Sequence, residues 1–432
     1  MIRTRHEVFE QRKSRALSLY EGAHAVERQA ERIDGLGRTH ALGPLKIVEI
    51  AEPFGVVAAI VVARSTDDGN TWTPWGTASM WGGNDKVMIA IDTKVHLNRV
   101  YLIWSRDTGT GDLTRISWSE NGTAWHPFSF GPNASADDQL GGSLAVGDDG
   151  KVYAMWNSAS DFGAGDRAWF SASTDGGDSW SNPTNVYSVS LSSYPNTALV
   201  PHPAAQNLRG VNPFPTLAVS HSAVFKNRLY VTYCDGHEIG TNPDGSYKID
   251  TDVFMRSSSN GGATWSNPVK VNDDVNDRTQ MLPWMAVDQS DGTVHVAWLD
   301  ARSSNPNKLI KAYYARSTDG GASFEPNRAL SKATADFANS ATITTNENSV
   351  DNVKADPNQY GDYIGVAAAN RQVWVAWPDS RQFFPNSTTN PKKEDIAAVR
   401  VIQCSAPVFL STPTATVQFP TWPVQVAWSG VV

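Results

Sequence analysis

Two short segments place an aspartate and an arginine two residues apart at the end of an apolar run. Their sequences are WLDAR at 298–302, with Asp300 and Arg302, and WPDSR at 377–381, with Asp379 and Arg381. A guanidinium group is planar and permanently charged, so it suits two-pronged binding of a ligand carboxylate. The same pair can instead fasten a loop by an internal ion pair. Because the pair recurs in equivalent loops, the structural role is favoured.

Other polar and ionisable residues gather in the segments between apolar runs. The ones that could join a site are Arg209, His237, Glu238, Asp273, Asp274, Asp277, Arg278, Gln280, Tyr360, Asp362 and Tyr363. They form one site only if the fold brings these connections together, so the elements that hold them have to be identified.

An eight-residue motif recurs along the chain, and it predicts those elements. It reads STDGGASF at 317–324, STDDGNTW at 65–72, STDGGDSW at 173–180 and SSNGGATW at 258–265. A degenerate copy, WSENGTAW at 118–125, is aligned with Glu120 at the acidic position. An Asp or Asn side chain accepts hydrogen bonds from the following N–H groups, and glycine supplies a positive φ. The motif therefore predicts a hairpin turn, and its terminal aromatic residue is expected to pack on a neighbouring element.

Short strand-like runs surround each copy of the motif. In the clearest unit, three runs precede the motif, at 284–288, 293–298 and 309–315, and a fourth follows it, at 328–330. The copies recur roughly every 55 residues, apart from one longer interval between Trp180 and Trp265, which is typical of propeller blades. We predict an all-β, six-bladed β-propeller of four-stranded antiparallel blades, with the first blade abbreviated. The missing last strand of the sixth blade is expected at 415–419, 424–428 or 46–50.

Residues 4–34 have apolar residues at helical spacing and predict an N-terminal amphipathic α-helix. The predicted domains are a helical segment, 1–40, and a single propeller, 41–432. The helix is expected to pack on the propeller or on a second copy of the chain, giving a homo-oligomer.

The net charge of −8 disfavours a nucleic-acid partner. No apolar run is long enough for a membrane span, and no secretory signal stands at the start. The two cysteines, Cys234 and Cys404, are compatible with one disulfide, but the sequence does not establish it.

In a four-stranded antiparallel blade, the turns between strands 1 and 2 and between strands 3 and 4 share one face. The repeated motif is a turn between strands 3 and 4. The connections that carry the aspartates, arginines and tyrosines are therefore expected on the opposite face, around the propeller axis.

The repeats resemble the Asp boxes of the sialidase-like (bacterial neuraminidase repeat) propeller family over roughly residues 45–403. The resemblance implies hydrolysis of a terminal acidic sugar, of the sialic acid class, and a secreted or cell-surface location. It implies an arginine cluster that binds the substrate carboxylate, a tyrosine nucleophile assisted by a glutamate, and an aspartate as acid/base. The matching positions are Arg278, Arg302 and Arg381 in the cluster, Tyr360 or Tyr363 as nucleophile, Glu238 as base, and Asp300, Asp362 or Asp379 as acid, with Arg209 as a further binding residue.

One departure leaves catalysis open. The arginine-bearing Arg-Ile-Pro motif that precedes the first blade in that family is absent. The alternative is therefore a non-catalytic propeller that binds glycan or protein through the same face. No cofactor is expected, although oxygen-rich stretches at 272–277 and 288–292 could hold Ca²⁺; solvated turns are the favoured interpretation of both.

Overall fold

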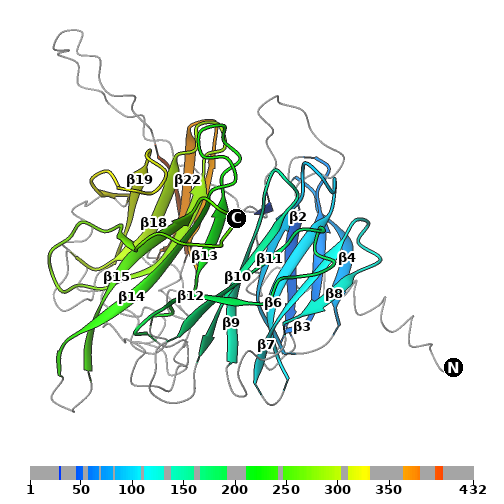
Figure 1. Cartoon of the computed structure of the whole chain (residues 1–432), viewed down its shortest axis with the longest axis horizontal. Coiled ribbons are helices and arrows are strands. Elements are labelled where there is room, and N and C mark those ends of the chain that lie inside the picture. The colour runs from blue at the N-terminus through cyan, green and yellow to red at the C-terminus, as the bar shows by residue number, and fades with distance from the viewer. Residues whose placement is uncertain are drawn as a thin grey trace, which may run out of the picture.

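The computed structural model describes residues 29–30, 45–51, 57–67, 70–80, 83–108, 111–130, 138–159, 166–191, 211–241, 247–302, 310–330, 363–379 and 395–401. All regular structure in these ranges is β-strand, arranged in antiparallel sheets. The sheets follow one another in chain order, from the blue and cyan strands β2 to β8 on one side to the green, yellow and orange strands on the other (Figure 1). Within the same ranges, no helix is long and apolar enough to cross a membrane.

The first sheet has eight strands and divides into two groups of four. The first group pairs in the order β1-β2-β3-β4, and the second in the order β5-β6-β7-β8. A single residue pair, Val57 with Asn84, joins them. The strands are β1 (Gln29–Ala30), β2 (Leu45–Ala51), β3 (Val57–Arg64), β4 (Thr73–Ser79), β5 (Asn84–Ile91), β6 (Val100–Asp107), β7 (Asp112–Ser119) and β8 (His126–Ser129).

Three four-stranded sheets and one three-stranded sheet follow. In each of them every strand pairs with its neighbour in sequence. The strands are β9 (Asp138–Val146), β10 (Val152–Ala159), β11 (Arg167–Ser173) and β12 (Thr184–Ser188); β13 (Thr216–Val219), β14 (Leu229–Thr241), β15 (Tyr247–Ser258) and β16 (Val269–Lys270); β17 (Gln280–Val287), β18 (Val294–Asp300), β19 (Lys311–Ser317) and β20 (Arg328–Ala329); and β21 (Gly365–Ala369), β22 (Gln372–Asp379) and β23 (Asp395–Val401).

The structure contradicts parts of two sequence predictions, one about the N-terminal helix and one about the strand that completes the last sheet. Within the predicted N-terminal helix, the structure describes Gln29 and Ala30, and these form strand β1 paired with β2, so a helix is wrong at this point. The rest of 4–34 lies outside the described residues. Strand β2 pairs with β1 and β3, so residues 46–50 do not supply a fourth strand to the three-stranded sheet β21-β22-β23. The alternatives at 415–419 and 424–428 lie outside the described residues.

The repeated motif forms the predicted hydrogen-bonded turn. In the copy at 317–324, the Ser317 hydroxyl donates to Asp319 Oδ1 at 2.7 Å, and the Ser323 N–H donates to the same oxygen at 3.0 Å. Gly321 has a φ of +85°, which an L-amino acid rarely adopts. The copies at 65–72, 173–180 and 258–265 repeat the two side-chain bonds.

The degenerate copy uses a different acceptor from the predicted one. Asn121, not Glu120, accepts hydrogen bonds from the N–H groups of Thr123 and Ala124, at 2.9 and 3.0 Å. The Glu120 carboxylate instead accepts from the Arg99 guanidinium at 2.7 Å. This copy is one residue shorter between its serine and its tryptophan, so alignment from the tryptophan put the acidic position one residue too early.

The turn aspartates predict a loss of stability in acid. Hydrogen bonds from Ser179 and Ser173 lower the pKa of Asp175 to about 2, against an ordinary value of 3.8, and Thr71 and Ser65 do the same for Asp67. A depressed pKa contributes stability above pH 3.8 that is lost as the pH falls towards 2. We expect the thermal unfolding midpoint to fall across this window, and to fall less when Asp67, Asp175 and Asp319 are all replaced by asparagine. Asn260 shows that asparagine fits the same turn. An equal fall in both proteins would contradict this.

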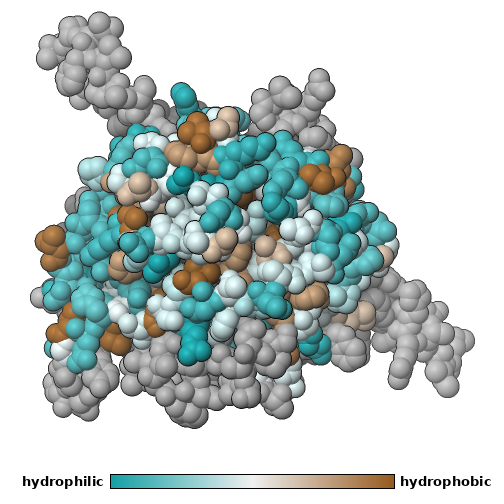
Figure 2. All heavy atoms as spheres, in the orientation of Figure 1, coloured by the Kyte–Doolittle hydropathy of each residue, from teal (hydrophilic) through white to brown (hydrophobic). Residues whose placement is uncertain are grey.

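Each turn also packs against the preceding sheet. A side chain on Gly262 would lie 2.2 Å from the ring of Phe170 in β11, and one on Gly177 would lie 3.1 Å from the ring of Tyr101 in β6. The Tyr101 hydroxyl donates to the Gly176 carbonyl at 3.1 Å. These turns therefore pack on strands of the neighbouring sheet. On the face drawn in Figure 2, exposed hydrophobic residues form small separate groups among polar ones.

Candidate functional site

A small pocket lies where β5, the first strands of the four following sheets, or the residues just before those strands, come together. We call it the central pocket. Its wall is mainly apolar and aromatic, and polar groups come from one asparagine, one threonine and one tyrosine. The lining residues are Met88, Gly141, Asn212, Phe214, Pro215, Thr216, Leu282, Pro283, Trp284 and Tyr363.

Three strands that reach the central pocket, β5, β9 and β17, carry bulges at equivalent places. The register shifts between Asp85 and Met88 in β5 and between Met281 and Trp284 in β17. The pairing of β9 with β10 shifts in the same way. A residue with left-handed backbone lies at each shift: Lys86 at φ +56°, Gly141 at +65° and Leu282 at +53°. Left-handed backbone at a non-glycine residue is costly, and both such residues and bulges are enriched near functional sites.

Lys86 is a site residue that the sequence did not reveal. Its side chain is 9% exposed, and its ammonium lies 5.3 Å from the ring centroid of Phe214 in the pocket wall. Its Nζ is also 3.0 Å from Asp85 Oδ2. The bulge turns this side chain toward Phe214, and a single-residue bulge could not be predicted from the sequence.

Tyr363 is the predicted catalytic residue that the structure places at the central pocket. It is half-buried, and its ring meets that of Trp284 edge to face, with centroids 5.9 Å apart. Of the other predicted residues, Glu238 is exposed on β14. Arg209, Tyr360, Asp362 and Arg381 lie outside the described residues, as does the side chain of Asp379.

Arg302 and Asp300 form a structural tie. Arg302 Nε donates to Asp300 Oδ2 at 3.0 Å, Nη1 to Asp273 Oδ1 at 2.6 Å and Nη2 to Asn327 Oδ1 at 2.8 Å. Asp300 is 1% exposed and also accepts from Trp298 Nε1 at 2.7 Å. The guanidinium thus links the end of β18 to the connections before β17 and β20. These contacts engage every nitrogen of the Arg302 guanidinium.

We expect Arg302→Ala to lower the free energy of unfolding by about 3 kcal/mol, because it leaves the buried Asp300 carboxylate without its charge partner. Arg278→Ala is the matched control: its Nη1 donates to the Asp277 carbonyl, 2.9 Å away, in a partly exposed position. Urea denaturation of both variants measures the difference. A stable Arg302→Ala protein that has lost ligand binding would instead favour the substrate-binding role.

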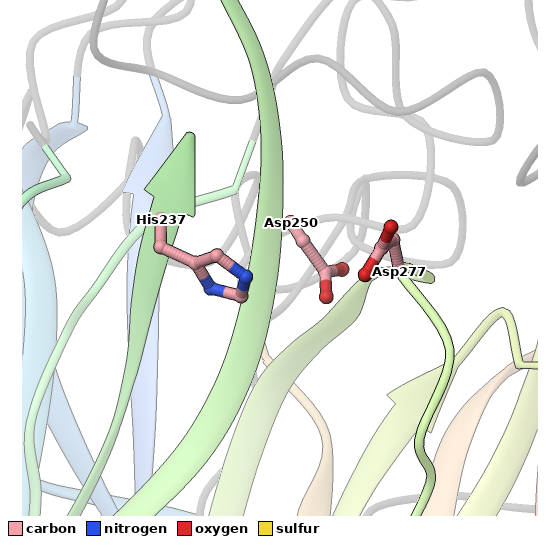
Figure 3. A group of neighbouring side chains, drawn as sticks. All are labelled: His237, Asp250 and Asp277. Carbon is pink, nitrogen blue, oxygen red and sulfur yellow. The ribbon is translucent and has the colours of Figure 1, made fainter. Parts of the chain in front are cut away.

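An acidic group lies at the junction of β14, β15 and the β16–β17 connection. Burial, together with the carboxylates of Asp252, Asp274 and Asp277, raises the pKa of Asp250 to about 7. One imidazole nitrogen of His237 and one carboxylate oxygen each of Asp250 and Asp277 lie within 4.8 Å of one another (Figure 3). The sequence indicated Asp277 and His237 separately. Their approach to Asp250 depends on the register of the long β14–β15 hairpin, in which His237 pairs with Asp250.

A second acidic group lies at the junction of β7 and β9. The Asp112 N–H donates to Asp138 Oδ1 at 2.8 Å. Burial, then the neighbouring carboxylates of Asp138, Asp107 and Asp85, raise the pKa of Asp112 to about 6, while Lys86 opposes this. A carboxyl group with such a pKa can donate a proton near neutral pH.

The stretches considered for Ca²⁺ are largely engaged by protein groups. Asp288 Oδ1 accepts from the Ser290 N–H at 2.9 Å, and Asp288 Oδ2 accepts from the Arg371 N–H. In the other stretch, Asn272 Nδ2 donates to Asp274 Oδ1 at 2.7 Å. Asp277 is the member of these stretches that points toward His237 and Asp250.

Comparison with known proteins identifies the fold. No protein family and no curated protein matches the sequence. Among solved structures, the chain resembles a mutant α-L-arabinofuranosidase from Fusarium graminearum in complex with an iminosugar inhibitor, with TM-score 0.52 and 13% identity over 87% of this chain and 92% of that one. This likeness, together with the succession of antiparallel sheets, shows a β-propeller.

Two further solved structures are similar at lower scores. An α-L-arabinanase from Penicillium chrysogenum, complexed with arabinobiose, has TM-score 0.48 and 12% identity over 87% of this chain and 92% of that one. An intramolecular trans-sialidase from Ruminococcus gnavus, in complex with oseltamivir carboxylate, has TM-score 0.39 and 11% identity over 74% and 85%.

Proposed function

We propose that this chain is a six-bladed β-propeller that hydrolyses the bond to a terminal sugar of a glycan held in the central pocket. The six blades are the two halves of the first sheet and the four sheets that follow. The observation that carries the proposal is the meeting of Trp284, Tyr363 and Phe214 in one pocket, with Trp284 at the bulge of β17. Aromatic rings suit the apolar faces of a sugar.

Tyr363 is the proposed nucleophile. A base would take the phenolic proton as the phenolic oxygen bonds to the anomeric carbon, and the bond from that carbon to the leaving-group oxygen would break as this oxygen takes a proton from a carboxylic acid. The resulting carboxylate would then take a proton from water, whose oxygen attacks the anomeric carbon and displaces the tyrosine oxygen, which regains its proton from the base. Asp112 is a candidate for the acid: its pKa is raised to about 6, and Lys86, which opposes this rise, lies beside Phe214 in the pocket wall. Asp300 is disfavoured as the acid, because it is buried in the tie with Arg302. Asp362, next to Tyr363 in sequence, stays an alternative, and Glu238 stays a candidate base.

The described part of the molecule favours an uncharged sugar. The Arg302 guanidinium donates to protein partners through all of its nitrogens, so it offers no free fork to a sugar carboxylate. The fold neighbour with the highest TM-score quoted above is an arabinofuranosidase, which acts on a neutral sugar. Lys86 beside Phe214 is the observation that favours the acidic sugar implied by the sialidase resemblance. Its ammonium would pair with a sugar carboxylate.

A panel of fluorogenic glycosides tests the proposal. It should contain α-L-arabinofuranosides and other neutral glycosides, a sialoside and several uronides. We expect turnover of one neutral glycoside, with retained configuration in the released sugar as judged by NMR, because a tyrosine nucleophile implies two displacements. Turnover of the sialoside or a uronide would select the acidic class. No turnover at all, together with specific binding on a glycan array, would select the non-catalytic propeller.

A further inference from the structure

The approach of His237, Asp250 and Asp277 brings an imidazole and two carboxylates together from three segments. His237 lies on β14, Asp250 on β15, and Asp277 in the connection before β17 (Figure 3). Their donor atoms lie within 4.8 Å of one another. We propose that these three side chains bind a divalent cation of the Zn²⁺ or Mn²⁺ type.

Asp250 has a buried carboxylate oxygen that a bound cation would satisfy. It is 4% exposed, and its Oδ1 atom is buried and accepts no hydrogen bond from a described residue. Its carboxylate lies between the imidazole of His237 and the carboxylate of Asp277 (Figure 3). A buried acceptor without a partner costs about 1–3 kcal/mol, and more when it is charged. A cation at this point would satisfy the oxygen and offset its charge.

The neighbouring carboxylates have partners in the protein, which distinguishes them from this pair. Asp252 Oδ1 lies 2.7 Å from Lys270 Nζ, and Asp274 Oδ1 lies 3.5 Å from Arg302 Nη2. Among the described residues, neither Asp250 nor Asp277 forms an ion pair with a lysine or an arginine. The unpaired negative charge is therefore concentrated on the two carboxylates that face the imidazole.

The donor set indicates the class of ion. Imidazole nitrogen favours borderline ions such as Zn²⁺, whereas Ca²⁺ and Mg²⁺ prefer oxygen ligands throughout. Zn²⁺ binds nitrogen and carboxylate oxygen at about 2.0–2.2 Å. Because His237 and Asp277 are exposed, their side chains are free to close on an ion, and positions on the solvent side stay open to water. The ion would link the long β14–β15 hairpin, through His237 and Asp250, to Asp277 in the connection that leads to the next sheet.

The test uses the full chain, treated with EDTA and exchanged into chelator-free buffer. ZnCl₂, MnCl₂ and CaCl₂ are titrated separately by calorimetry, and thermal unfolding is followed at saturation. We expect one equivalent of Zn²⁺ or Mn²⁺ to bind and to raise Tm, because a ligand of the native state alone stabilises it. His237→Ala, Asp250→Asn and Asp277→Asn should each weaken binding at least 10-fold, since each removes a direct ligand.

His221→Ala is the matched control, because it removes a partly exposed imidazole from the turn before β14, at the other end of that strand. It should leave the affinity unchanged. His237 and Asp277 are exposed, so their variants are expected to fold even if Asp250→Asn is not stable. Equal binding by wild type and the three variants, absence of binding of Zn²⁺ and Mn²⁺, or binding of Ca²⁺ in preference to both would overturn the proposal. None of these outcomes bears on glycoside turnover.

Discussion

Gly262→Ala is expected to lower the free energy of unfolding by about 3 kcal/mol. Two costs combine. Gly262 has a φ of +89°, which disfavours any residue with a Cβ atom, and that Cβ would lie 2.2 Å from the Phe170 ring. Phe170 is 4% exposed in the core between two sheets, so its ring cannot swing into solvent. Denaturant unfolding measures the loss.

Gly261→Ala separates these two costs. Gly261 lies in the same turn at φ +71°, but a Cβ there would meet only the Tyr153 hydroxyl, 4.0 Å away. This variant should show the backbone cost alone, about 1 kcal/mol. In the double variant with Phe170→Leu, part of the Gly262→Ala penalty should disappear, because the smaller side chain removes the clash. Equal penalties at positions 261 and 262 would mean that the turn does not hold the sheets together.

The repeated turns explain why so much of the fold could be predicted from sequence. Their hydrogen bonds are local: Asp319 reaches no farther than Ser317 and Ser323, so the residue types alone specify the turn. Strand order follows, because each turn joins strands that are adjacent in sequence. The bounds of the first strand in a sheet were harder to predict. Strand β17 begins at Gln280 rather than at the predicted Trp284, because the bulge at Leu282 interrupts the alternation of buried and exposed residues.

The site was less predictable because its residues meet through non-local pairing. The sequence identified Arg302 as a strong cation beside an aspartate, but its partners Asp273 and Asn327 come from other connections. The sequence does carry one usable signal for the His237–Asp250 pair. The sequence Pro-Asp-Gly, which favours a turn, stands midway between them, and a hairpin predicted to be centred there would pair His237 with Asp250.

Tyr363→Phe is expected to lower kcat on the best glycoside of the panel by a factor on the order of 10³ or more, as loss of a nucleophile does. The change removes one oxygen atom and keeps the ring that packs edge to face on Trp284, so the fold should persist. KM should change little, because the ring still lines the central pocket. Initial rates over a range of substrate concentrations separate the two constants, and thermal unfolding checks the fold.

Tyr153→Phe is the matched control for this experiment. Tyr153 is 1% exposed in β10, and its hydroxyl lies beside the turn at Gly261 rather than at the central pocket. Loss of that hydroxyl should leave kcat unchanged. A Tyr363→Phe enzyme with undiminished kcat would remove Tyr363 as the nucleophile, and Asp112 would then be the next residue to replace. If kcat persists and KM rises instead, Tyr363 contributes to sugar binding through its hydroxyl and takes no part in bond cleavage.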